Sequence, residues 1–150
     1  MKRSVKETKR VIIFGVFDRL HLRHRAFLGQ AKRHGKEVIA VVARDSAVKR
    51  LKNRKPMQNE KIRMRNVCRV SEVSRATLGD RKEGEYGALK KIKPDVICLG
   101  YDQQALENDL KKRMCHKKIP RIRLVRLRAF MPKKYHSSIF SRLSLDGKKV

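Results

Sequence analysis

The sequence has no tryptophan, and aromatic residues make up only 5% of its 150 residues. Proteins that bind single-stranded nucleic acid stack its bases on aromatic side chains, so this scarcity disfavours such a stacking surface. Cysteine is scarce too, because the chain has only Cys68, Cys98 and Cys115. Three cysteines without the close spacing of metal ligands predict free thiols in a reducing compartment and disfavour a disulfide framework or a zinc site.

Long hydrophobic runs are also absent. No apolar stretch approaches the roughly 20 residues of a membrane-spanning helix. The basic segment 1–10 is not followed by the hydrophobic stretch of a secretory signal. We therefore expect a cytoplasmic protein without a membrane partner, in which residues 1–10 form a basic tail. Residues 11–150 are enough for a single domain with its own hydrophobic core.

Acidic residues are few: 14 aspartates and glutamates stand against 41 lysines and arginines, which gives a net charge of +27. A charge excess of this size attracts anions such as nucleotides, polyphosphates, RNA or DNA without choosing among them. Most of these cations are typical of a solvated surface, so only cations within a motif are evidence for a site. Non-specific binding to nucleic acid stays open.

Hydrophobic patterns predict strands and helices that alternate along the chain. Strands are expected at residues 11–14, 37–43, 72–78, 95–100 and 121–128. Helices are expected at residues 23–34, 45–51, 84–93, 106–114 and 137–143, with another that Asn59 caps and that contains Ile62, Val67 and Cys68. This alternation predicts an α/β fold whose parallel sheet has helices on both faces. Ligands of such sheets bind beyond the carboxyl ends of the strands.

The segment from Gly15 to His24 follows the first expected strand and contains two histidines, His21 and His24. If residues 23–34 are helical, the two imidazoles lie one turn apart near the positive end of the helix. Imidazoles and free backbone N–H groups can bind a phosphate there. Two histidines at this spacing, standing alone, are more often surface or capping residues, so the other motifs of the chain decide the interpretation.

The pattern Gly15-x-Phe17-Asp18-x-x-His21-x-x-His24 resembles G-T-F-D-x-x-H-x-G-H of a nucleotidyltransferase family. This family includes the glycerol-3-phosphate and phosphocholine cytidylyltransferases. Three further segments look like the archaeal-type FAD synthase branch of the family: Ala43-Arg44-Asp45-x-x-Val48-Lys49-x-x-Lys52-x-Arg54-Lys55-Pro56, Lys93-Pro94-Asp95-x-Ile97-x-Leu99-Gly100-x-Asp102-Gln103 and His136-Ser137-Ser138. The resemblance covers residues 10–145, nearly the whole domain.

This resemblance implies a Rossmann-like fold, a three-layer parallel sheet with helices on both faces. It implies an enzyme that transfers AMP or CMP from a nucleoside triphosphate, ATP or CTP, to a phosphate-bearing acceptor and releases pyrophosphate. In the FAD synthase branch the acceptor is FMN and the product is FAD. The resemblance also implies Mg²⁺ bridging the phosphate oxygens of the nucleotide. We expect no metal-binding residues of the chain itself.

By the same resemblance, His21 and His24 are catalytic and contact the triphosphate and the transition state. The other implied contacts are backbone and packing against the nucleotide, neutralisation of phosphates, recognition of ribose or base, and phosphate binding at a last helix. Val16 and Phe17 are implied to contact the nucleotide through backbone and packing, and Lys49 or a neighbour at 52–55 to neutralise phosphates. Asp102, Gln103 and Phe130 are implied to recognise the ribose or base, and Ser137 and Ser138 to bind a phosphate at the last helix. Arg23 completes the set of implied nucleotide-binding residues.

Two residues depart from the family pattern. Val16 replaces a threonine and removes a hydroxyl, and Arg23 replaces the glycine that lets a phosphate approach the backbone between the histidines. The Arg23 guanidinium either occupies the phosphate site and blocks it, or swings out and adds a bidentate phosphate contact. Blocking predicts a catalytically impaired relative that binds nucleotide or RNA, whereas an added contact predicts an active enzyme. The sequence also leaves a homodimer open.

Overall fold

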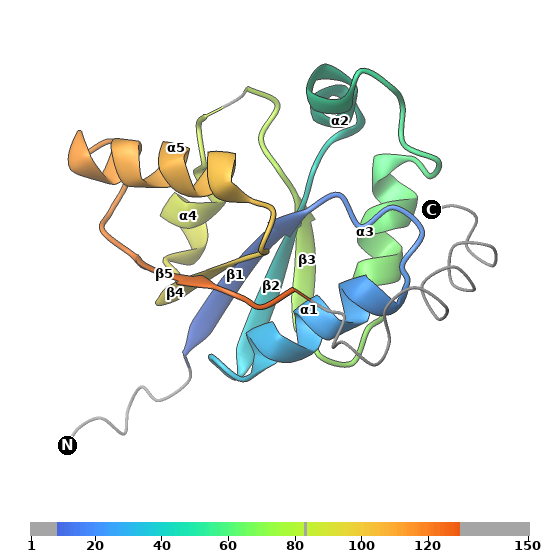
Figure 1. Cartoon of the computed structure of the whole chain (residues 1–150), viewed down its shortest axis with the longest axis horizontal. Coiled ribbons are helices and arrows are strands. Elements are labelled where there is room, and N and C mark those ends of the chain that lie inside the picture. The colour runs from blue at the N-terminus through green and yellow to red at the C-terminus, as the bar shows by residue number, and fades with distance from the viewer. Residues whose placement is uncertain (1–8, 83, 130–150) are drawn as a thin grey trace.

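Five parallel strands form the centre of the molecule, in a computed structural model that describes residues 9–82 and 84–129 (Figure 1). The elements in chain order are β1 (Arg10–Gly15), α1 (Leu22–Lys32), β2 (Glu37–Val42), α2 (Asp45–Lys52), α3 (Glu60–Cys68), β3 (Arg75–Leu78), α4 (Gly87–Ile92), β4 (Val96–Leu99), α5 (Gln104–Cys115) and β5 (Arg123–Arg126). The strands stand in the order β3-β2-β1-β4-β5, and every neighbouring pair is parallel. The predicted α/β fold with a parallel sheet is confirmed.

Helices cover both faces of the sheet and create two hydrophobic cores. The apolar runs of β1, β2 and β4 are typical of strands that are buried on both faces. Ile13 of β1 packs in one core with Leu28 of α1. Ile12 points to the opposite face and packs in the second core with Leu89 of α4 and Leu110 of α5. The three-layer, Rossmann-like arrangement is therefore confirmed as well (Figure 1).

The carboxyl ends of β1 and β4 are neighbours at the point where the strand order reverses. β1 pairs with β2 on one side and with β4 on the other. The chain leaves β1 toward β2 and leaves β4 toward β5, so the two following loops diverge and open a crevice. Gln103 ties the strand ends together, because its amide donates to the Phe14 carbonyl at 2.9 Å and accepts from the Gly100 N–H at 2.7 Å.

Element boundaries agree with the expected ones within a few residues. The sequence predicts a strand at 72–78, but β3 begins only at Arg75. The backbone N–H of Val73 instead donates to the carbonyl of Val70 in a turn, and both valine side chains are buried. Apolar residues that are buried in a turn therefore give the same sequence pattern as the start of a strand.

Two further predictions concern helices. Asn59 caps α3 as predicted, since its side chain accepts a hydrogen bond from the N–H of Ile62 at 2.9 Å. The helix expected at 137–143 lies outside the described residues. Within the described part of the chain, no helix is both long and apolar enough to cross a membrane.

Candidate active site

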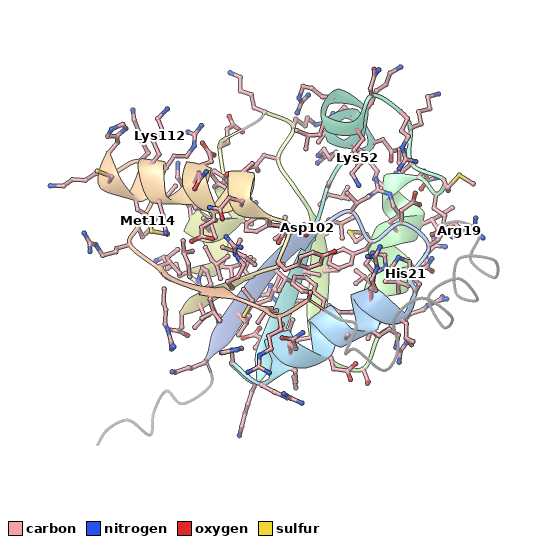
Figure 2. All side chains as sticks on the ribbon, in the orientation of Figure 1. Arg19, His21, Lys52, Asp102, Lys112 and Met114 are labelled. Carbon is pink, nitrogen blue, oxygen red and sulfur yellow. The ribbon has the colours of Figure 1, made fainter. Side chains whose placement is uncertain are left out.

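A cavity of about 910 Å³ lies at the carboxyl ends of the strands. This volume is within the range of pockets that bind nucleotide-sized ligands. His21 before α1, Lys52 at the end of α2 and Asp102 after β4 all line the cavity, and Figure 2 shows them coming from different elements. The predicted residues Val16, Phe17, Arg23, His24 and Gln103 line it too. The structure thus brings together residues that are more than 80 positions apart in the sequence.

The two histidines form one hydrogen-bonded unit at the start of α1. Their rings are stacked with centroids 3.9 Å apart and an interplanar angle of 23°. The backbone N–H of His21 donates to Nδ1 of His24 at 3.2 Å. Because Nδ1 accepts this bond, the proton of neutral His24 is on Nε2. His24 therefore offers an N–H donor to a ligand such as a phosphate oxygen.

The surroundings of the histidines hold them in the neutral form. Burial, followed by the nearby His21 and Arg23, lowers the pKa of His24 to about 3, although Asp18 opposes the shift. Burial and then Arg23 also lower the pKa of His21. Near neutral pH, His24 is thus uncharged, and its Nε2–H is a neutral hydrogen-bond donor. The positive charge at this end of the cavity comes from Arg19, Arg23 and the start of α1.

The loop between β1 and α1, residues 16–21, is shaped around Phe17 and is called the histidine loop below. Phe17 and Arg19 both have φ of 53°, a left-handed conformation that is rare for such residues. The Phe17 side chain is buried against the ring of His24, with centroids 5.6 Å apart. A Cβ on Gly15 would lie 2.7 Å from the Phe17 ring. Glycine at position 15 therefore allows Phe17 to fold back and support His24.

Asp18 holds a second loop beside the histidines through hydrogen bonds. Residues 53–58, called the basic loop below, follow α2. The two carboxylate oxygens of Asp18 accept hydrogen bonds from the N–H groups of Met57 and Gln58 at 2.7 and 2.9 Å. The N–H of Arg19 donates to the Gln58 side chain at 3.0 Å. These bonds hold the basic loop, including the cavity-lining Arg54, next to the histidine loop.

Arg63 on α3 is fully buried and joins both loops to α2. Its guanidinium donates to the carbonyls of Val16 and Gln58, each at 2.9 Å, and to the carboxylate of Asp45 at 2.6 Å. The sequence does not reveal this role, because an arginine in a basic amphipathic helix is indistinguishable from a solvated one. Its partners lie 5, 18 and 47 positions away in the sequence.

Asp45 and Glu60 fix the start of α2. The N–H of Asp45 donates to Glu60 at 2.7 Å, and the N–H of Glu60 donates back to the Asp45 carboxylate at 3.3 Å. The Arg44 side chain spans to the carbonyl of Gly79 beyond β3 at 2.7 Å. These contacts orient α2, so Arg50 and Lys52 near its end line the cavity.

Other predicted residues have different placements. Lys49 is exposed on α2 and is not among the residues that line the cavity, whereas Arg50, Lys52 and Arg54 are. Phe130, Ser137 and Ser138 lie outside the described residues, so their implied contacts stay predictions. Between residues 9 and 129, the described positions contain no group of three or more His, Cys, Asp or Glu that could hold a metal ion.

Comparison with known proteins agrees with this geometry. The model of the cytidylyltransferase-like family matches residues 12–141. The FAD synthase of Aciduliprofundum boonei is 43% identical over 121 residues, which are 81% of this chain and 79% of that protein. The FAD synthase of Methanosarcina mazei is 42% identical over 119 residues, covering 77% of each chain.

A solved structure has the same fold. The lipopolysaccharide core biosynthesis protein of Thermoplasma volcanium superposes with a TM-score of 0.74 at 35% identity, and the match covers 82% of this chain and 98% of that one. The family match spans most of the chain and confirms the predicted nucleotidyltransferase. This chain belongs to the cytidylyltransferase-like family.

Proposed function

We propose that this protein is an FAD synthase, which transfers AMP from ATP to the phosphate of FMN and releases pyrophosphate. The observation that carries the proposal is the pair His21 and His24, held neutral at the start of α1 in a cavity that Lys52 and Arg54 also line. Similarity to FAD synthases over more than three quarters of the chain supports FMN as the acceptor.

The reaction needs alignment of its substrates more than proton transfer. The phosphate of FMN is largely ionised at neutral pH, because its second pKa is about 6, so its oxygen attacks without a general base. A bond forms from this oxygen to the α-phosphorus of ATP, and the bond to the pyrophosphate oxygen breaks. Catalysis of this kind depends on positioned donors and cations that stabilise the charge on the phosphates.

The residues of the cavity supply such groups. The Nε2–H of His24 and the N–H groups at the start of α1 donate to oxygens of the α-phosphate. Arg23, exposed on the first turn of α1, binds the triphosphate, and Lys52 and Arg54 neutralise phosphate charge. Asp102, at the opposite side of the cavity, accepts hydrogen bonds from the ribose or the base.

Mg²⁺ accompanies ATP in this proposal. The Asp18 carboxylate already accepts two backbone hydrogen bonds, and the described residues have no cluster of carboxylates to hold the ion. The ion would therefore arrive with the phosphates of ATP and keep several of its waters, as is common for Mg²⁺ bound with nucleotides. When bound, the ion neutralises charge on the phosphates.

The test is a matrix of substrates. The protein is incubated with Mg²⁺, with ATP or CTP, and with FMN or glycerol 3-phosphate, while chromatography detects FAD and a coupled assay detects pyrophosphate. We expect FAD and pyrophosphate in equal amounts from ATP and FMN alone. His24→Ala should lower the turnover by about 10²- to 10³-fold, because a positioned donor to the transition state is lost.

His116→Ala is the matched control, since His116 is exposed at the end of α5 and does not line the cavity. It should keep the wild-type rate. Absence of FAD from ATP and FMN, or full activity of His24→Ala, would refute the proposal. Nucleotide binding without pyrophosphate release from any acceptor would support the catalytically impaired relative instead.

A further inference from the structure

Large apolar side chains are exposed in the cavity. Four large apolar residues of the described chain are notably exposed: Leu51 by 72%, Met57 by 69%, Tyr101 by 50% and Leu22 by 44%. Leu51, Met57 and Tyr101 line the cavity, and Leu22 does not. Exposed apolar residues that gather at a concave site are typical of a surface that a ligand covers.

These residues form two groups on opposite sides of the histidine loop. Leu51 and Met57 belong to the segment that follows β2, and Tyr101 follows β4. β2 and β4 flank β1 in the sheet, and the histidine loop continues from β1. An apolar surface thus lies on each side of the histidines, which suits a reaction that joins two ring-bearing molecules at a phosphate.

The charges differ between the two sides. Arg50, Lys52 and Arg54 line the cavity beside Leu51 and Met57. The side of Tyr101 has the carboxylate of Asp102, which suits the hydroxyl and amino donors of adenosine, and a single lining cation after β5, Arg128. FMN combines a flat apolar ring with a dianionic phosphate, and only the first side offers apolar side chains together with several cations.

The backbone of this side is fixed although its side chains are exposed. The Met57 N–H donates to the Asp18 carboxylate at 2.7 Å. Leu51 is in the last turn of α2, which ends at Lys52. The C-cap residue Asn53 is in the left-handed conformation and donates its N–H to the Lys49 carbonyl at 2.8 Å. The side chains of Leu51 and Met57 are therefore exposed although hydrogen bonds hold their backbone in place. Methionine also adapts to a flat ring, because its side chain is unbranched and polarizable.

We propose that Leu51 and Met57 form the flavin subsite and contact the isoalloxazine ring of FMN, while the side of Tyr101 and Asp102 takes the adenosine of ATP. This inference rests on the proposed FAD synthase function and adds which part of the cavity recognises the acceptor. Leu51 and Met57 are then specificity-determining residues, and their loss weakens binding of the flavin but not of ATP.

The experiment measures binding directly. FMN and riboflavin are each titrated with protein, and quenching of flavin fluorescence gives the Kd. The double variant Leu51→Ser/Met57→Ser is compared with Cys115→Ser, which changes an exposed side chain at the end of α5, outside the cavity lining. We expect the double variant to bind both flavins roughly tenfold or more weakly, because the ring loses apolar contact. Its KM for ATP should stay within about twofold of wild type, and Cys115→Ser should change neither the flavin Kd nor the KM for ATP.

Three results would refute the proposed flavin subsite. One is wild-type affinity for FMN in the double variant, and another is an equal rise of the KM for ATP and for FMN. The third is weaker binding of FMN with unchanged binding of riboflavin, since riboflavin has the ring but not the phosphate. If the wild-type protein makes FAD and the double variant gives any of these results, the proposed function stands and only the flavin subsite is refuted. If the wild-type protein does not bind FMN, both the subsite and the proposed function are refuted.

Discussion

Arg63 shows how a single buried charge can organise a site. Moving a guanidinium out of water is costly, and the cost is offset only when its donors are satisfied. Arg63 achieves this with the carbonyls of Val16 and Gln58 and the carboxylate of Asp45. Its three partners belong to the histidine loop, the basic loop and α2. One side chain therefore sets the relative positions of the segments that carry the histidines and the cations.

Loss of Arg63 should destabilise the protein strongly. Arg63→Met leaves two half-buried carbonyls and the partly exposed carboxylate of Asp45 without their donor, so we expect the free energy of unfolding to fall by about 3 kcal/mol. Urea unfolding measures this change. Arg65→Met, on the same helix but exposed, should change the value by no more than about 0.5 kcal/mol. Equal effects of the two variants would contradict the role of Arg63.

His24 should make stability depend on pH. Its pKa in the folded protein is about 3, below the value of about 6.5 for an unfolded chain. Between these values the unfolded state binds more protons, so the free energy of unfolding rises as pH increases and falls as pH decreases. His24→Gln should flatten this dependence in urea unfolding between about pH 4 and pH 7. The exposed His116→Gln should retain it, and identical slopes for wild type and His24→Gln would argue against a neutral, protected His24.

Arg23 has opposite effects on stability and on binding. A cation in the first turn of a helix opposes the helix dipole, so Arg23→Ala should raise the free energy of unfolding by about 0.3–1 kcal/mol. If the guanidinium binds phosphate, the same variant should raise the KM for ATP about tenfold. Arg25→Ala removes the same charge from α1 at an exposed position outside the cavity lining and serves as the control. A lower KM for Arg23→Ala would instead show that the side chain blocks the site.

At the scale of elements, the basic loop depends on Asp18 for its position. Asp18→Asn removes the charge that strengthens two hydrogen bonds to the loop backbone. We expect kcat/KM for ATP to fall about tenfold or more while the fold persists, because the loop cations lose their alignment with the histidines. Steady-state kinetics measure the effect, and circular dichroism checks the fold.

Glu72→Gln is the matched control for this prediction. It removes the same charge at the turn before β3, which is at the opposite end of the sheet from the cavity. It should keep the wild-type kcat/KM. If Asp18→Asn also keeps it, the basic loop is positioned without Asp18 and the cations act only through their charge.

Local patterns predicted the elements well because their determinants are local. The apolar run before Gly15 predicted β1, and the side chain of Asn59 predicted the start of α3. The site was predictable only in part. His21 and His24 stand three positions apart within one motif, whereas Arg63 and Asp18 act mainly through backbone groups of distant segments. Backbone acceptors and donors have no sequence signature, so only the fold could reveal these two roles.

At the scale of the whole molecule, the net charge of +27 surrounds the cavity with a positive field. Such a field attracts ATP and FMN, but it attracts other polyanions as well, since it carries no information about shape. The cavity rim itself contains Arg50, Lys52 and Arg54. A polyanion on this rim would compete with ATP for the same cations.

Polyuridylate should therefore inhibit FAD formation at low ionic strength by raising the apparent KM for ATP without changing kcat. Binding that rests on phosphate contacts weakens steeply with salt, so the inhibition should vanish between about 50 and 300 mM KCl. Lys112→Gln/Lys118→Gln removes two cations of α5 and the turn after it, which do not line the cavity, and it should leave the inhibition unchanged. Inhibition that persists at high salt would instead indicate an RNA site that recognises shape or bases, because only contacts other than charge survive screening.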